Sequence, residues 1–274
     1  MISKLNLIRS LIESFKLKSY HTQLEENIQI NHLKYKKSTK NLINKIYICH
    51  HKPLVHRKEY LEKRLLSKGL EVYWVDFFLP QEIENKYDQI VGTKELNISP
   101  NVPGISQGQY KLFENAGTKI TITELSLYKK IEYCLEDQVK GNRELIVILE
   151  DDIVIPNNIV EYLDLCASEF LFSNNNLDCL MMGTAFGFRS PYYKPDRLIH
   201  YGKNQLTRCT HAMMFSLYGA KKILRNLYPV NWPIDFKLNE IFIKEKMRVA
   251  WAEPGLIQLS HTSYEESSLS KVRD

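Results

Sequence analysis

Three carboxylates, Glu150, Asp151 and Asp152, follow the apolar run Leu145–Leu149 with no residue between them. An apolar run of this length is typical of a strand that is buried on both faces. Because an unpaired buried carboxylate is very costly, we expect these side chains at the edge of that strand, facing water, a cation or a substrate. In open α/β sheets, ligands bind at the carboxyl ends of the strands. The pattern therefore favours a metal-assisted site at the edge of a parallel sheet.

Side chains alternate along an extended chain, so we expect Glu150 and Asp152 to point one way and Asp151 the other. Glu150 and Asp152 then offer the hard oxygen ligands that Mg²⁺ or Mn²⁺ prefers. Such a cation is most useful where a diphosphate is held and released, because it neutralises the charge that grows on the leaving group. The same three residues also fit a phosphoester hydrolase, a nuclease, a structural Ca²⁺ site or a solvated acidic turn.

The elements around the carboxylates predict an α/β fold. Ile46–Cys49 predicts a buried strand, residues 55–68 predict a helix that Gly69 closes, and Glu71–Asp76 predicts a second strand. This alternation is typical of βαβ units and a parallel sheet. Residues 80–118 show little periodicity and predict a long loop, a common place for substrate-binding elements. Later helices are predicted over 121–138, 157–172, 219–227 and 233–246, and later strands over 178–183, 211–216, 248–251 and 256–259, with a turn at Pro254-Gly255.

The charge is unevenly distributed along the 274 residues. Residues 1–44 carry eight Lys or Arg and three Glu, whereas the rest of the chain carries 29 residues of each sign. The main domain, residues 45–274, therefore gains no support for nucleic-acid binding. Residues 1–44 form a basic N-terminal arm, whose first 18 residues predict an amphipathic helix. We expect that helix to pack on the domain or on a partner in preference to a membrane surface.

The five cysteines are odd in number and form no zinc-binding pattern, which favours free thiols in a reducing compartment. No apolar run approaches the ~18 residues of a membrane span. The N-terminus also lacks the features of a signal peptide. The expected location is cytoplasmic or peripheral to a membrane.

Several segments, in the same order as in the family, resemble glycosyltransferase family 25, which includes lipooligosaccharide transferases and collagen galactosyltransferases. The resemblance covers about residues 45–262, and its most specific part is the acidic motif. Two departures stand out: residues 123–127 lack the family's His, and Cys49-His50 replaces a common Asn-Leu. The segments that carry the resemblance are Ile46-Tyr47-Ile48 with Arg57, Val147–Asp152, Thr210–Ser216 with Gly219–Leu224, and Pro233-Ile234-Asp235 with Leu238.

The resemblance implies a GT-A-type fold, with a Rossmann-like, mixed but mainly parallel sheet flanked by helices. It also implies a UDP-sugar donor, Mn²⁺ or Mg²⁺, and inversion at the anomeric carbon. The expected activity is transfer of a hexose, galactose or glucose, to a hydroxyl group on a glycan or on a protein. Inversion by direct displacement needs a general base, and Asp235 is our candidate, with Glu240 and Asp76 as weaker ones. Asp235 equally fits an ordinary carboxylate in the first turn of a helix.

Four further residues complete the predicted site. Asp76, at the end of the second strand, could bind a ribose hydroxyl, and Arg57 could bind the diphosphate or simply face solvent. Asp151 is expected to contact the donor sugar or to support its neighbours. His261 could join Glu150 and Asp152 on the metal, although a lone His is more often an ordinary surface or core residue.

Two other functions compete with hexose transfer. A metal-dependent phosphoester hydrolase could use the same carboxylates, but no D-x-D-x-T pattern follows a strand. A degenerate, non-catalytic glycan-binding protein is the second alternative, motivated by the altered segment 123–127.

Overall fold

The computed structural model describes residues 42–86, 89–90, 120–172, 176–183, 198–201 and 209–258. The predicted helix in residues 1–18, most of the predicted loop 80–118, and His261 lie outside the described residues. The start of that loop is described and is not irregular. It forms the short helix α3 (Pro80–Ile83) and a 3-10 turn, η1 (Glu84–Lys86).

The described strands form one mixed sheet of seven strands, which confirms the α/β fold. The strand order is β2-β1-β3-β6-β4-β7-β5. The pairs β2-β1, β1-β3 and β4-β7 are parallel, whereas β6 runs antiparallel to both of its neighbours and β5 runs antiparallel to β7. The strands are β1 (Lys45–Cys49), β2 (Tyr73–Val75), β3 (Leu145–Glu150), β4 (Cys179–Gly183), β5 (Ile199–Tyr201), β6 (Ala212–Ser216) and β7 (Val249–Leu256).

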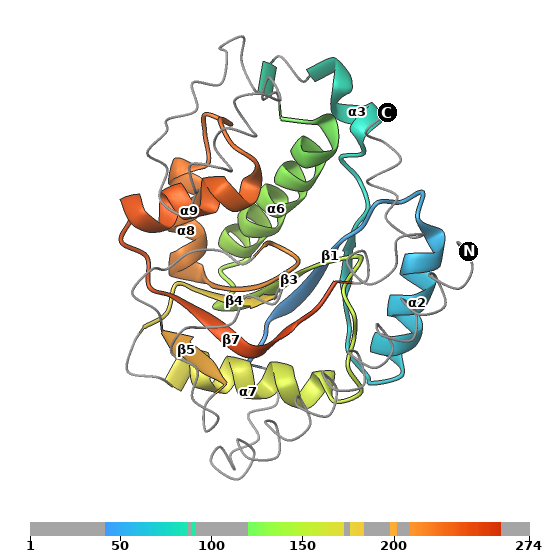
Figure 1. Ribbon diagram of the computed structural model, residues 1–274, viewed down its shortest axis with the longest axis vertical. Helices are drawn as coiled ribbons and strands as arrows, with labels where there is room; N and C mark the ends of the chain where they lie inside the picture. Colours follow the sequence, from blue (N-terminus) through green and yellow to red (C-terminus); the bar gives the residue numbers. More distant parts are fainter. Residues whose placement is uncertain are drawn as a thin grey trace, which may run out of the picture.

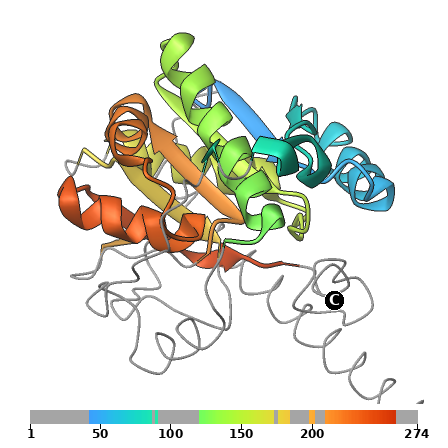
Figure 2. The same ribbon diagram turned by 90° about the horizontal axis from the view of Figure 1, so that it is seen from above.

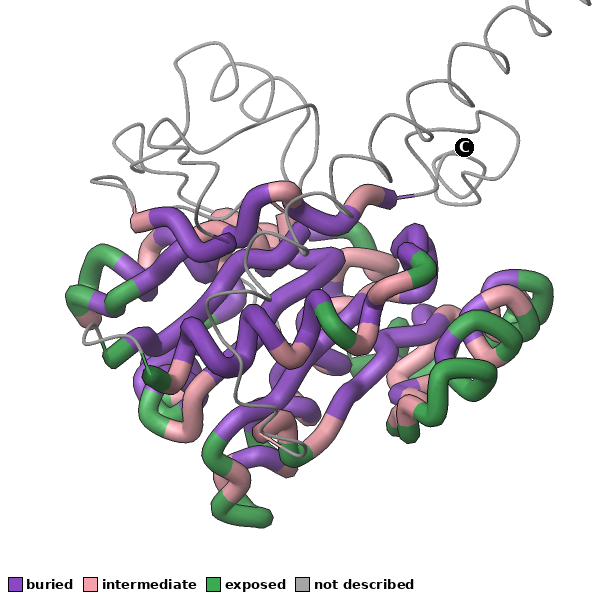
Figure 3. The backbone as a smooth tube through the Cα atoms, turned by 90° about the horizontal axis from the view of Figure 1, so that it is seen from below, coloured by how far each residue is buried: buried purple, intermediate pink, exposed green. Residues whose placement is uncertain are grey.

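Helices cover both faces of the sheet (Figures 1 and 2). One face packs against α2 (Val55–Leu66) and α7 (Ile159–Phe172). The other face packs against α6 (Ile122–Lys140), α8 (Leu217–Asn226) and α9 (Ile234–Lys244). The strands form a largely buried centre, and most of the exposed residues lie on the helices and turns around it (Figure 3).

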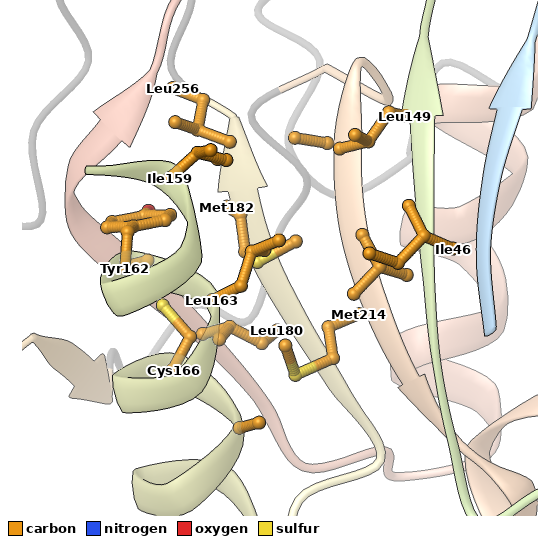
Figure 4. Close-up of a cluster of buried hydrophobic side chains, with 14 of the residues drawn as sticks. Ile46, Leu149, Ile159, Tyr162, Leu163, Cys166, Leu180, Met182, Met214 and Leu256 are labelled. Atoms are coloured by element: carbon orange, nitrogen blue, oxygen red, sulfur yellow. The ribbon is translucent and has the colours of Figure 1, made fainter. Parts of the chain in front are cut away.

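The strand β3 is buried on both faces, as its apolar run predicts. Leu145, Val147 and Leu149 belong to the core beneath α2 and α7, and Ile146 and Ile148 to the core beneath α6, α8 and α9. All five are fully buried. Figure 4 shows part of the first core, with Met214 beside Leu180 and the α7 side chains Leu163 and Cys166 next to them. Because both faces of β3 are buried, the charged residues can follow it only where the strand reaches the edge of the sheet.

The prediction of a turn at Pro254-Gly255 is wrong. Both residues lie inside β7, which continues to Leu256. The pairing of β4 with β7 shifts register between Met181 and Gly183, and Pro254-Gly255 fall within that irregularity. Proline has no N–H to give to a regular ladder, so it is tolerated where the ladder is interrupted. The edge strand β5 was also not predicted, because its three residues carry too weak a pattern.

Among the described helices, none combines the length and apolar character that a membrane crossing requires.

Candidate functional site

The three carboxylates lie at the edge of the sheet that their pattern predicts. Because β1, β2 and β3 are parallel and β6 is reversed, the carboxyl ends of the first three strands and the start of β6 share one edge. Glu150 is the last residue of β3, and its N–H donates to the carbonyl of His211 at 2.9 Å. The Thr210 hydroxyl donates to Glu150 Oε1 at 2.7 Å.

The Glu150 carboxylate is held where its ionised form is disfavoured. Burial raises the pKa of Glu150 to about 8, and the negative charge of Asp152 adds to the effect. The charges of Asp151 and Asp235 raise this pKa further, while the hydrogen bond from Thr210 opposes them. Several negative side chains therefore converge on Glu150, an arrangement that a cation would relieve.

Asp152 is buried and is braced by distant parts of the chain. Gln258 Nε2 donates to Asp152 Oδ1 at 3.4 Å, and Arg57 Nη1 lies 4.0 Å from Asp152 Oδ2. Just beyond Asp152, Ile153 pairs with Gln258 in an antiparallel bridge. The segment that follows β7 thus fixes the acidic turn after β3.

Asp151 has most of its partners in the loop after β1. The extended chain on which the predicted alternation depends stops at Glu150, because Asp151 and Asp152 lie in a turn. Its Oδ2 accepts from the backbone N–H of His51 at 2.8 Å and lies 2.9 Å from His50 Nδ1. Its Oδ1 accepts from Arg57 Nη1 at 2.7 Å. Burial alone would raise the pKa of Asp151, but the bond to His50, the charge of Arg57 and the His51 N–H hold that pKa below its usual range. Asp151 therefore joins β3 to the loop after β1 and to α2.

Arg57 is buried, so the alternative that it faces solvent is wrong. Its guanidinium pairs with Asp151 and approaches Asp152 from the same nitrogen. The contact with Asp151 is short, at 2.7 Å, whereas Asp152 lies 4.0 Å from that nitrogen. Arg57 thus brings a buried positive charge to the edge of the sheet that holds the three carboxylates.

Asp151 is expected to contribute strongly to stability. Asp151→Asn removes the counter-charge of a buried guanidinium, which should lower the free energy of unfolding by about 3 kcal/mol in urea titrations at pH 7. Because its pKa is lowered on folding, ionised Asp151 stabilises the fold above its unfolded pKa of about 4, and this contribution is lost as the pH falls through the folded pKa. The free energy of unfolding of Asp151→Asn should therefore lack this loss at acidic pH.

The matched control for that measurement is Asp76→Asn. The ion pair between Asp76 and Lys58 spans 3.8 Å, and both side chains are about one-third exposed, at 33% and 32%. Its loss should cost at most about 1 kcal/mol. Equal destabilisation by the two variants would show that Asp151 is not the anchor that its contacts indicate.

Asp76 lies at the carboxyl end of β2, as predicted. It follows Val75, the last residue of β2, and the carbonyl of Val75 accepts the N–H of His50 at 3.1 Å. Since the strand order is β2-β1-β3, the loop after β1 lies between Asp76 and Glu150. A ligand that contacts both of these carboxylates must pass over that loop.

Asp235 lies in the first turn of α9 and remains partly exposed. Burial raises the pKa of Asp235, the N–H of Phe236 lowers it, and the charge of Glu124 raises it again. Glu124 is the capping-box residue of α6, where it accepts from the N–H of Thr121 at 2.8 Å. The helices α6 and α9 therefore both place a carboxylate in their first turns, electrostatically linked to each other and, through Asp235, to Glu150.

The predicted metal ligands are only partly brought together. Glu150 and Asp152 share the edge of β3, whereas His261 lies outside the described residues. Within the described ranges, no three His, Cys, Asp or Glu side chains are arranged to hold a metal ion. Thr210 and Gln258 were missed from the sequence, because hydroxyl and amide side chains next to strands carry no distinctive pattern.

Comparison with models of known protein families finds no match to this chain, and comparison with curated proteins finds no relative.

Proposed function

We propose that the protein is a metal-dependent inverting glycosyltransferase that moves a hexose, galactose or glucose, from a UDP-sugar to a hydroxyl group of a glycan or a protein. The observation that carries the proposal is the position of Glu150 and the buried Asp152 together at the carboxyl end of β3, where the charge of Asp152 helps to raise the pKa of Glu150. The ordered motifs that resemble glycosyltransferase family 25 support the same reading. Asp151 is hydrogen-bonded to His51 and Arg57, so Glu150 and Asp152 are the two carboxylates that we propose bind a cation.

The donor set fits Mg²⁺ or Mn²⁺. Ions of this kind are commonly held by one or two carboxylates, and the phosphates of a substrate and water complete the shell. Glu150 and Asp152 would supply the carboxylates, and our prediction for His261 would add a third ligand. When bound, the cation neutralises the negative charge that develops on the departing diphosphate.

The residues of the chain account for the other steps of transfer. Asp235 would take the proton from the acceptor hydroxyl as its oxygen attacks the anomeric carbon. The bond from that carbon to the diphosphate oxygen breaks, and UDP leaves with the bonding electrons. Arg57 would bind the diphosphate, and Asp76 would accept a hydrogen bond from a ribose hydroxyl. Attack from the side opposite to the leaving group inverts the configuration.

The test is a thermal-shift titration of the full chain with UDP-galactose and UDP-glucose, with and without Mn²⁺. A donor at about 100 times its Kd should stabilise the fold by about 2.7 kcal/mol, which raises the melting temperature by roughly 5–10 °C. The shift should require Mn²⁺, and slow release of UDP should accompany it.

Other results would point elsewhere. Phosphate release from a simple ester, with no preference for nucleotide sugars, would indicate the phosphoester hydrolase. Neither a thermal shift nor UDP release in any combination would contradict transfer and favour a non-catalytic glycan-binding protein.

A further inference from the structure

One peptide bond at the candidate site is held from both sides. The carbonyl of His50 accepts from Lys130 Nζ at 2.5 Å, and the N–H of His51 donates to Asp151 Oδ2 at 2.8 Å. These two groups belong to the same planar peptide unit, whose C=O and N–H point in opposite directions when it is trans. Lys130 and Asp151 therefore fix the plane of the His50–His51 peptide between them.

The two anchors come from different layers of the fold. Asp151 follows β3 in the sheet, whereas Lys130 lies on α6, which covers one face of that sheet. The imidazole of His50 also contacts Asp151 and packs edge-on against Trp74 on β2, with ring centres 5.4 Å apart. The loop after β1 is thus fixed to both neighbouring strands and to a helix.

A lysine at position 130 does more than fill space in the core. Its side chain is buried, and a buried ammonium is costly unless it is compensated. Burial lowers the pKa of Lys130, while the nearby charges of Asp151 and Asp76 act in the opposite direction. An apolar residue of similar length would fill the space without that cost. The ammonium is explained by the main-chain carbonyl it holds and by the carboxylates around it.

The position of this peptide matters for a donor. Because β1 lies between β2 and β3, a nucleotide sugar that contacts Asp76 with its ribose and places its diphosphate near the cation proposed at Glu150 crosses the His50–His51 peptide. The orientation of that peptide determines the path of the loop towards Arg57. We infer that Lys130 is a positioning residue for the donor site, which fixes this peptide before the donor arrives. The inference rests on the proposed function.

The test compares Lys130→Met with Lys129→Met in the full chain. Lys129 is the next residue on α6, but it pairs with Glu132 and Tyr228, away from the loop. Lys130→Met should increase hydrogen exchange at the His51 amide about tenfold or more, as expected when a hydrogen bond from a charged group is lost. It should also raise KM for the UDP-sugar about tenfold while kcat for UDP release stays within about twofold. Lys129→Met should change neither quantity.

Lys130→Arg, which keeps a charged donor, should recover most of the exchange protection and of the KM. If Lys130→Met does not fold, Lys130→Gln takes its place with the same expected changes, because its shorter side chain stops short of the carbonyl. Unchanged exchange at His51 would overturn the role of Lys130 in fixing the peptide. Faster exchange with an unchanged KM would overturn its role in the donor site. If the wild-type protein binds no UDP-sugar, the proposed function fails, and the role of Lys130 in the donor site fails with it. Hydrogen exchange at His51 still tests whether Lys130 fixes the peptide.

Discussion

Asp235→Asn is expected to lower kcat for UDP release from a UDP-hexose, with water as the acceptor, by roughly 100- to 10,000-fold. The substitution preserves the size of the side chain and removes its ability to take a proton. Asp235 is partly exposed in the first turn of α9, and burial together with the charge of Glu124 raises its pKa. A base is more effective when its pKa lies closer to the working pH. The Kd for the donor, measured by calorimetry with Mn²⁺, should stay nearly constant, because the base acts on the acceptor.

Glu240→Gln is the matched control on the same helix. Glu240 pairs with Lys237 at 3.3 Å, and its side chain is 37% exposed. We expect Glu240→Gln to retain kcat within about threefold, in line with a partly exposed ion pair. A large loss in Glu240→Gln with full activity in Asp235→Asn would move the base to Glu240. Full activity in both variants would show that Asp235 only caps the dipole of its helix.

Glu150→Gln and Asp152→Asn should each lower Mn²⁺-dependent UDP release on the order of 100-fold, because each removes a carboxylate proposed to bind the cation. The apparent affinity for Mn²⁺, measured by titration of the activity, should fall in parallel. Glu161→Gln on α7 is the control, since Glu161 is exposed and lies in another layer of the fold. Equal turnover in wild type and in both site variants would remove the acidic turn from the mechanism.

The stability of Glu150→Gln separates a functional carboxylate from a structural one. The ionised form of Glu150 is disfavoured by burial and by the charge of Asp152. Its replacement should therefore leave the melting temperature unchanged or raise it, since sites kept for function often cost stability. A marked fall in the melting temperature would instead mean that Glu150 stabilises the fold.

The central strand and its acidic edge were predictable because their signals are local. The run Leu145–Leu149 could only be a buried strand or a buried helix segment, and the carboxylates that follow it set its end. The alternation of side chains does not account for the position of Asp151, because Asp151 and Asp152 lie in a turn after β3. Asp151 is placed instead by its bonds to His51 and Arg57. Those partners lie about 100 residues away in the chain, so no local pattern could identify them.

The features that the sequence did not predict depend on contacts between distant segments and not on a local pattern of residues. The strand β5 is defined by its antiparallel pairing with β7, and Glu169 on α7 accepts the N–H groups of Leu198 and Ile199 at the edge of the sheet. The continuity of β7 through Pro254 depends on a register shift against β4. In the sequence, Lys130 is one of several charged residues in a predicted helix. Only the packing of α6 on the sheet shows that it is buried.

The reversed strand β6 has a consequence for how the chain folds during synthesis. It fills the gap between β3 and β4, and it is made after both of them. A nascent chain that ends before Ala212 therefore presents two apolar strands, each with an unpaired edge that invites association with another chain. The release of residues 212–216 from the ribosome is the step at which β6 can pair with both β3 and β4, and with it the Thr210 hydroxyl reaches Glu150. We expect truncation before this point to yield aggregates in place of a smaller folded unit.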